Sequence, residues 1–296
     1  MKTFMHKLTF FLGFALIPVC LFGQEADEGD GRGVVIIALK EGPTRFLDWE
    51  GNVLPEDKTK LGSALPEGNS AQAGVGGKII LLFSNGTVMT LESQSMLKIR
   101  EFSQEPFDAR GRKVEDLKEE PSKSNVKLDL DWGSIVVGTK KLDRESSLDI
   151  STPSGTAGIR GTQFQMSQNP GTGLKLDVTE STVAFTPKGA ARPVAIGPGR
   201  GLDVSSAGVA TPRPVNPVVA QNINVNNNVA EQATKEVPLV SVSEAMDSAT
   251  TEAKQEEGAR PREGGPREAE ERRGEAGDEP GEQGGREGSR NERRGE

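Results

Sequence analysis

Lys78-Ile79-Ile80-Leu81-Leu82-Phe83-Ser84-Asn85-Gly86-Thr87-Val88-Met89-Thr90-Leu91 is the stretch of this 296-residue sequence that decides the fold class. An apolar run, Lys78–Phe83, ends at Ser84-Asn85-Gly86, and a second run over residues 87–91 returns. Asn-Gly between two apolar runs is a strong hairpin signal, because tight turns between antiparallel strands need positive φ angles. The stretch predicts a β-hairpin, and this turn explains Asn85-Gly86-Thr87 better than the glycosylation sequon that the same residues form.

Short apolar or alternating segments continue on both sides of the hairpin. In residues 126–132, Val126, Leu128 and Leu130 alternate with polar residues, which places the apolar set on one face of a strand. Further strands are expected at residues 34–39, 96–99, 135–137, 148–150, 162–166, 174–178, 183–185, 194–196 and 202–204. Many short strands at close spacing predict an all-β fold: a single β-rich roll or sandwich, or a solenoid-like domain. A short helical turn is expected at residues 114–120, where Pro121 stops it.

The β-rich domain is expected over residues 31–205, and a linker rich in Pro and Asn over residues 206–238. Ser241 and Glu244 form a capping-box pattern, which predicts a weak helix near residues 242–257. The rest of the segment 239–296 consists mainly of Glu, Arg, Gly and Pro and cannot build a core, so a disordered charged tail is expected. A solvated tail or spacer is favoured over an RNA-binding tail, because Glu neutralises Arg and aromatic residues for base stacking are missing.

The N-terminus has the pattern of a secretory signal peptide. Lys2 and Lys7 flank a basic start, residues 8–22 are almost all apolar, and acidic residues follow at once. We expect cleavage after Gly23, which removes residues 1–23 and leaves no stable membrane span. The protein is then exported to the periplasm or the extracellular space. Anchoring by an uncleaved N-terminus or by a lipid on Cys20 is the less favoured alternative.

Cleavage also limits the chemistry that the chain can perform. It removes His6 and Cys20, the one His and the one Cys, and Tyr is absent from the whole sequence. A Ser–His–Asp triad, a Cys–His pair and a zinc site built on His or Cys are therefore excluded. We predict no catalytic, cofactor or metal site and no enzymatic activity. The net charge of −8 for the whole chain opposes nonspecific binding to nucleic acid or to an anionic membrane.

Two stretches resemble the FecR family of extracytoplasmic domains, over a signature core at residues 62–204. The first is Gly62-Ser63-Ala64-Leu65-Pro66-Glu67-Gly68 followed by the hairpin described above. The second, more specific stretch is Ile150-Ser151-Thr152-Pro153-Ser154-Gly155-Thr156-Ala157-Gly158-Ile159-Arg160-Gly161-Thr162-Gln163-Phe164. The family signature falls on Gly68, Gly86, Thr152, Pro153, Gly155, Gly158, Gly161, Thr162 and Phe164. These residues are interpreted as structural, because Pro starts turns and Gly permits tight or positive-φ backbone. Arg160, which lies between Gly158 and Gly161, is the candidate binding residue.

In the best-known members, the resemblance implies a regulator with a cytoplasmic segment that restrains a sigma factor, a membrane helix and a periplasmic sensing part. Only seven residues precede the apolar run here, so we expect a stand-alone exported FecR-like protein without the anti-sigma segment. The expected function is a non-catalytic protein-interaction, structural or sensing module of the cell envelope. Its partner would be an envelope protein or polymer and not nucleic acid. Two alternatives stay open: an accessory component of transmembrane signalling that acts with another chain, and a carbohydrate-binding β-protein.

Overall fold

The hairpin predicted from the sequence is present in the β domain, where it lies between β1 and β7. The structure is a computed structural model, and it describes residues 31–109, 112–235 and 237. Strand β4 (Lys78–Phe83) pairs antiparallel with β5 (Val88–Leu91), and Phe83 N donates to Thr87 O at 2.9 Å. Gly86 has a φ of 84°, the positive value that the Asn-Gly signal requires. Asn85 is fully buried, so the folded domain offers no access to it as a glycosylation site.

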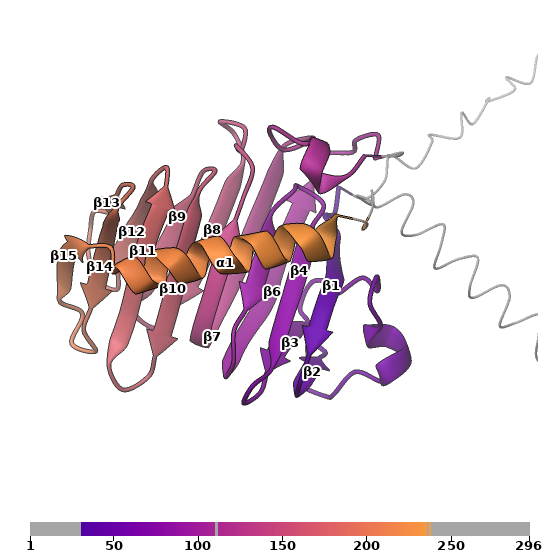
Figure 1. The fold of residues 1–296 in the computed structure, drawn as a ribbon, viewed down its shortest axis with the longest axis horizontal. Coiled ribbons are helices and arrows are strands. Elements are labelled where there is room, and N and C mark those ends of the chain that lie inside the picture. The colour runs from indigo at the N-terminus through magenta and orange to yellow at the C-terminus, as the bar shows by residue number, and fades with distance from the viewer. Residues whose placement is uncertain (1–30, 110–111, 236, 238–296) are drawn as a thin grey trace, which may run out of the picture. The chain divides into compact units, whose positions relative to one another are not determined.

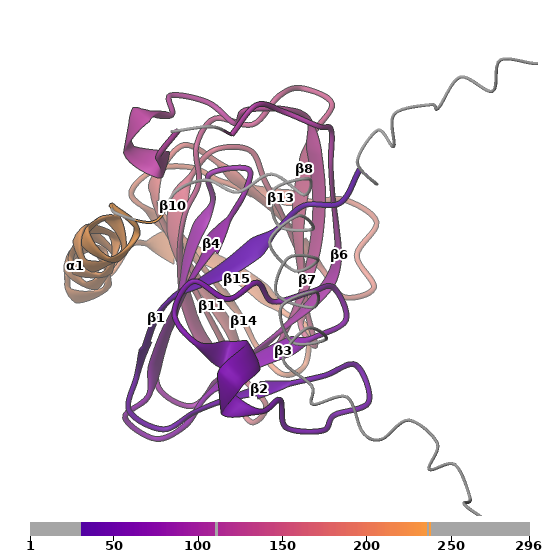
Figure 2. The same ribbon diagram turned by 90° about the vertical axis from the view of Figure 1, so that its right-hand side faces the viewer.

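The strands form two facing layers (Figures 1 and 2). The helix-side layer runs in the order β1 (Val35–Glu41), β4, β5, the end of β7 (Ser124–Gly138), β10 (Gln163–Asn169), β11 (Gly173–Glu180), β14 (Arg200–Val204) and β15 (Ala210–Pro214). The opposite layer runs in the order β2 (Thr44–Leu47), β3 (Ser70–Ala73), β6 (Ser95–Gln104), the start of β7, β8 (Ser147–Thr152), β9 (Gly155–Ile159), β12 (Val183–Pro187) and β13 (Val194–Ile196). The expected all-β fold is confirmed, and it is a two-layer arrangement of β-strands.

The core lies between the two layers and follows the period-two pattern of the sequence. Val126, Leu128 and Leu130 of β7 are all 0% exposed, and the polar residues between them face outward. Phe83 from the helix-side layer meets Phe102 from the opposite layer, with ring centroids 5.6 Å apart. Alternation along each strand therefore fills one shared interior, where burial of large apolar side chains stabilises the fold by about 1.5–3 kcal/mol each.

Strand β7 belongs to both layers because it bends at Gly133. Its first part pairs with β6 and β8, and its last residues pair with β5 and β10. Gly133 has a φ of 100°, and a Cβ there would lie 2.2 Å from the Cα of Ser95. Only glycine fits this bend. Residues 135–137, predicted as a separate strand, are therefore the continuation of β7 into the second layer.

The second signature stretch also differs in part from its prediction. The sequence predicted that Pro153 starts a turn and placed no strand between residues 150 and 162. The turn holds only Pro153 and Ser154, and residues 155–159 form strand β9. Gly155, Ala157 and Ile159 are buried in alternation, which is a strand pattern that the small residues concealed. The predicted helical turn at residues 114–120 is present only as the short 3-10 helix η2 (Val114–Asp116); a second, η1, spans Glu56–Thr59.

The predicted linker at residues 206–238 is wrong for most of its length. Residues 210–214 form strand β15, and helix α1 (Pro217–Thr234) lies across the outer face of the helix-side layer (Figures 1 and 2). The helix begins at Asn216, whose side chain accepts a hydrogen bond from Val218 N at 2.9 Å, with Pro217 in its first turn. Asn has a weak intrinsic helix preference, but here the Asn side chains bond to the sheet and so stabilise the helix in place.

Several predictions concern residues outside the described ranges. These are the signal peptide at residues 1–23, the alternative lipid on Cys20, the weak helix near residues 242–257 and the charged tail to residue 296. Within the described ranges, none of the helices combines the length and apolar character needed to cross a membrane.

Candidate functional site

The connection between β7 and β8, residues 139–146, is where the two family motifs meet. Because β7 and β8 pair in parallel, this connection must carry the chain from the helix-side layer back to the opposite layer. Gly86 of the first motif packs on it: a Cβ on Gly86 would lie 3.1 Å from Lys140 Cγ. Gly161 of the second motif packs on the same residue, since a Cβ there would lie 3.1 Å from the Lys140 carbonyl oxygen. Motifs far apart in the sequence thus converge on one connection.

The second motif holds the connection at both of its ends. Gly161 has a φ of 88°, and a Cβ on it would lie 2.9 Å from Lys141 Cα. Beside it, the Thr162 carbonyl accepts a hydrogen bond from Thr139 N at 3.1 Å. The guanidinium of Arg160 donates to the Arg144 carbonyl at 2.8 Å. Arg160, the candidate binding residue, is exposed, and its hydrogen bond to Arg144 holds the far end of the connection.

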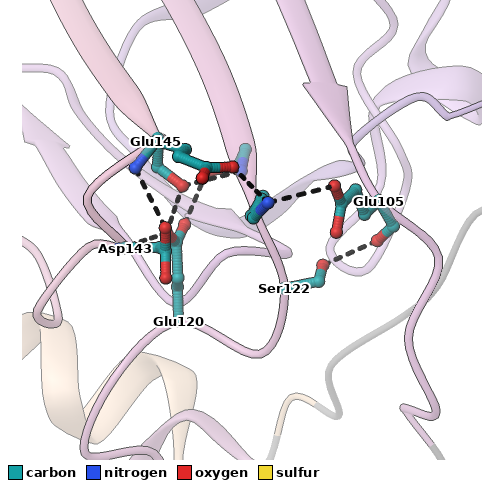
Figure 3. A network of polar contacts seen from close by, with 8 residues as sticks. Glu105, Glu120, Ser122, Asp143 and Glu145 are labelled. Atoms are coloured by element: carbon teal, nitrogen blue, oxygen red, sulfur yellow. Dashed lines mark hydrogen bonds and ion pairs between the residues drawn. The ribbon is translucent and has the colours of Figure 1, made fainter.

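Glu120 holds the middle of the connection through a buried carboxylate (Figure 3). The carboxylate accepts hydrogen bonds from Asp143 N at 2.6 Å, from Ser124 Oγ at 2.6 Å and from Ser146 Oγ. Ser124 Oγ in turn accepts from Asn85 Nδ2 at 3.1 Å, which ties the first motif into the same network. Both carboxylate oxygens have protein donors, so the negative charge fixes the connection in place.

An exposed ion cluster borders this network (Figure 3). Lys123 forms an ion pair with Glu145 and lies 4.0 Å from Glu105, and Ser122 Oγ donates to the Glu105 carbonyl at 2.6 Å. The hydrogen bond and the charge of Glu145 raise the pKa of Lys123 above its ordinary value. Among the described residues, no group of three or more His, Cys, Asp or Glu side chains is arranged to hold a metal ion.

A cavity of about 450 Å³ opens beside the near end of the connection. Its walls come from the C-terminal half of α1, from η2, from the Gly86 turn and from the ends of β7 and β10. Val88, Val114 and Ala230 supply apolar surface, and the side chains of Gln163 and Asn227 supply amides. The volume falls within the roughly 300–1,000 Å³ that is usual for ligand sites.

Four charged residues are among those that line this cavity, and they are called its rim below. Lys140 belongs to the β7–β8 connection, Glu115 to η2, and Glu231 and Lys235 to the end of α1. Glu115, Glu231 and Lys235 are exposed, and Lys140 is half-buried. The charges of the rim balance, two positive and two negative.

A row of amide contacts holds α1 against the sheet and so completes the cavity. Asn222 Nδ2 and Asn226 Nδ2 both donate to Glu92 Oε1, at 2.9 and 3.2 Å. Asn227 Nδ2 donates to Gln163 Oε1 at 2.7 Å, on the cavity wall. Ile223 and Ala230 are buried on the same side of the helix. The sheet therefore holds α1 through hydrogen-bonded amides at its centre and through apolar contacts beside them.

The outer face of the opposite layer carries a separate set of charges. Burial raises the pKa of Asp149, and the nearby charges of Lys127 and Arg160 oppose that shift. Burial, together with the charge of Asp129, likewise raises the pKa of Asp131. Unlike the cavity, this face has no described helix over it.

The remaining signature residues are placed at turns and in the core. Thr152 Oγ1 donates to Gly155 O at 2.9 Å and accepts from Ser154 N at 3.1 Å, which closes the tight turn at Pro153. Gly155 has a φ of 149°, and a Cβ there would lie 2.3 Å from Thr186 O. Each of these contacts fixes the backbone of the turn.

The signature residues farther from this turn differ in their surroundings. Phe164 is fully buried in the core. Gly68 has a φ of 82°, and its N–H donates to the Ile99 carbonyl at 2.7 Å. Gly158 differs from the other four signature glycines because its φ is not positive and the nearest atom to a Cβ would lie 3.4 Å away.

The sequence analysis did not identify most of the residues that line the cavity, or the Glu120 carboxylate that holds the β7–β8 connection. No structural role was predicted for Glu120, and Asn227 lay in the predicted linker. The available signal was Asn216 followed by Pro217, an N-cap and first-turn pair that marks a helix start. No local signal places Gln163 opposite Asn227, because that contact depends on how α1 crosses the sheet.

The comparisons with known proteins confirm the resemblance. The family model described as FecR protein matches residues 70–184, which include the hairpin and the second signature stretch. Two crystal structures, each of a candidate anti-sigma factor from Parabacteroides distasonis ATCC 8503, are similar in structure. The one at 1.65 Å has 11% identity and a TM-score of 0.37, and the alignment covers 50% of this chain and 60% of that chain. The one at 2.50 Å has 10% identity and a TM-score of 0.39, with 62% of this chain and 91% of that chain covered. No curated protein gives a significant sequence match.

Proposed function

We propose, from the FecR domain that this chain carries, that the protein is an exported, non-catalytic interaction module of the cell envelope. The observation that carries the proposal is the convergence of both family motifs on the β7–β8 connection, beside the cavity under α1. The motifs hold the backbone that lines one side of a ligand-sized space. Their residues therefore position a binding site and do not themselves supply reactive groups.

The chemistry of the site supports binding over catalysis. The carboxylate of Glu120 is buried and accepts three hydrogen bonds from the protein. Residues 31–237 contain no His or Cys, the side chains used most often for acid–base and nucleophilic work. What faces the cavity is a mixture of amides, small apolar side chains and balanced charges, a composition suited to recognition.

A sensing role in transmembrane signalling, together with another chain, is the second candidate. The match to the FecR family favours it, because the resemblance implies a periplasmic part that senses a partner. The two roles share one site and differ in the outcome of binding. Carbohydrate binding has less support at this cavity, since none of its lining residues is aromatic and none can stack on a sugar ring.

Affinity capture from a native envelope extract tests the proposal, with the full-length chain as bait. The site variant combines Glu231→Gln and Lys235→Gln at the cavity rim. The matched control combines Lys118→Gln and Glu119→Gln, which make the same charge changes at exposed positions outside the cavity. We expect the wild type and the control to retain the same discrete partner and the rim variant to lose it. Equal recovery by all three chains would contradict the proposed site.

A change in transcription of a sigma-factor regulon after deletion of the gene would assign the signalling role. An unchanged regulon with a retained partner would leave the structural or interaction role. Transcription of the regulon thus distinguishes the signalling role from the structural or interaction role, and it does not depend on the affinity of the site.

A further inference from the structure

We infer that helix α1 is a hinged cover: it detaches from the helix-side layer as one unit while both β layers stay folded, and so opens and closes the cavity beside it. This motion goes beyond the proposed function, because it concerns how the cavity forms and not what binds there. Three features indicate it: the polar sheet face on which α1 lies, the few apolar side chains that α1 buries, and the charged anchor at its N-terminal end.

The sheet face beneath the middle of α1 is polar and is hydrogen-bonded within itself. Glu92, Ser134, Gln165 and Ser167 all lie half-buried on this face. Gln165 Nε2 donates to Glu92 Oε2 at 3.1 Å and to Ser134 Oγ at 2.9 Å. Ser167 Oγ donates to Ser134 Oγ, also at 2.9 Å. These bonds do not involve α1 and persist when the helix leaves, so the face tolerates water in its place.

The bonds that α1 makes to this face are ones that water can replace. Asn222 Nδ2 and Asn226 Nδ2 donate to Glu92 Oε1 at 2.9 and 3.2 Å, and Lys78 Nζ donates to Asn226 Oδ1 at 3.2 Å. Amide and ammonium groups also bond well to water. Each of these bonds therefore contributes little net free energy toward holding the helix on the sheet.

Within residues 217–234, α1 buries one large apolar side chain. The buried residues of the helix are Ile223, Asn226, Ala230 and Thr234. The helix lies on the outside of its layer, away from the core between the layers (Figures 1 and 2). That core holds large side chains that are all 0% exposed, among them Phe83, Phe102, Phe164 and Phe185. Detachment of α1 therefore exposes far less apolar surface than unfolding of the layers, which favours local opening.

A charged anchor fixes the N-terminal end of α1. The guanidinium of Arg213 in β15 donates through Nη1 and Nη2 to the buried carboxylate of Asp177, at 2.5 and 2.8 Å. Its Nε donates to Asp203 Oδ1 at 2.7 Å. Asn216 N, at the start of the helix, donates to Asp177 Oδ1 at 3.4 Å. The chain is thus held to the sheet as far as Asn216, and the helix beyond it pivots there.

Detachment of α1 dismantles the cavity, because the helix supplies one wall and the sheet supplies another. Asn227 and Lys235 lie on the helix side, whereas Val88, Gln163 and Lys140 come from the strands and their connections. These walls separate when the helix leaves. A ligand that contacts both walls binds only the closed form, and its binding energy then holds α1 on the sheet.

Amide hydrogen exchange of the full-length chain, resolved by peptide with mass spectrometry, tests the motion. A free helix of this length that is rich in Asn and Val is mostly unfolded in water, so its amides exchange whenever it leaves the sheet. We expect residues 221–233 to exchange at least about 100 times faster than the amides of β4 and β10, which wait for global unfolding.

An engineered disulfide distinguishes detachment from fraying of the helix in place. A Cβ on Gly138 would lie 3.8 Å from Asn227 Cγ, so Gly138→Cys and Asn227→Cys can form a bond between sheet and helix. Cys20→Ser is added to remove the other Cys of the chain. Oxidation should slow exchange in residues 221–233 at least about tenfold, toward the rate of β4 and β10, and reduction should restore it.

Two substitutions separate opening of α1 from global unfolding. Glu92→Gln places an amide donor where Asn222 and Asn226 need an acceptor, and it should accelerate exchange in residues 221–233 about three- to tenfold. The control is Ile150→Val, in the core of the opposite layer. It should accelerate exchange in β4 and β10 about two- to tenfold and leave residues 221–233 unchanged, because Ile150 stays packed when α1 opens.

Three results would overturn the inference. They are exchange in residues 221–233 at the rate of β4 and β10 in the reduced chain, acceleration of α1 and the core by equal factors in Ile150→Val, and fast exchange of α1 that the disulfide does not slow. None of them bears on the proposed function, because exchange is measured on the isolated chain. A failure of envelope capture likewise leaves the exchange results as they are.

Discussion

Replacement of Glu120 by Ala tests whether the hydrogen bonds to its carboxylate hold the β7–β8 connection in place. The carboxylate accepts three hydrogen bonds, and a hydrogen bond to a charged group contributes about 1.5–3 kcal/mol. The Ser124 and Ser146 hydroxyls can rotate toward other acceptors, but the Asp143 N–H is fixed by the backbone. We therefore expect Glu120→Ala to lower the free energy of unfolding by about 3–4 kcal/mol, less than the sum of three independent bonds.

Urea titration of the full-length chain, followed by tryptophan fluorescence, measures this change. Glu119→Ala is the matched control, because Glu119 is the exposed neighbour and its side chain has no hydrogen bond or ion pair within the described residues. Its effect should stay within about 0.5 kcal/mol. Hydrogen exchange at the Asp143 amide should accelerate in the Glu120 variant. If the two variants unfold within 1 kcal/mol of each other, Glu120 does not hold the connection as described.

Four other substitutions give sharp expectations. Gly161→Ala should lower the free energy of unfolding by about 1–3 kcal/mol because of its positive φ and the 2.9 Å approach to Lys141, whereas Gly158→Ala should change it by less than about 0.5 kcal/mol; urea titration of both checks this. Arg213→Met should lower it by about 3–5 kcal/mol, because it leaves the buried carboxylate of Asp177 without its two guanidinium bonds. Asp149→Asn should stabilise the protein at pH 7. Burial raises the pKa of this carboxyl above its unfolded value of about 3.9, so the folded state binds the proton more tightly and the unfavourable charge exists only above the raised pKa. The stabilisation should shrink as the pH falls through that pKa toward about 4.

The part of the fold that could be predicted is the part with local signals. The Asn85-Gly86 turn and the alternation in residues 126–130 each depend on neighbours in the sequence, and both appear in the structure. Strand β9 was hidden because its small residues are also turn residues. The passage of β7 between layers was hidden because only the contact with Ser95 shows that Gly133 is a bend within one strand.

The cavity could not be predicted, because each of its walls depends on a distant contact. Asn-rich sequence favours loops by intrinsic preference, and the sheet overrides that preference through the bonds from Asn222 and Asn226 to Glu92. Likewise, nothing near Glu120 in the sequence reveals that Ser146 and Asp143 will donate to it. The family motifs pointed to the right region, since Gly86 and Gly161 meet at Lys140, but they did not reveal the helix that completes the site.

Site-specific photo-cross-linking in cells that produce the full-length chain tests the central claim most directly. A photoreactive residue is placed at position 231 on the cavity rim, and separately at position 192, which is exposed in the turn between β12 and β13. We predict that position 231 forms a discrete adduct with a partner polypeptide and that position 192 does not. An absence of adducts at position 231, or the same adducts from both positions, would contradict the claim that this cavity is the binding site.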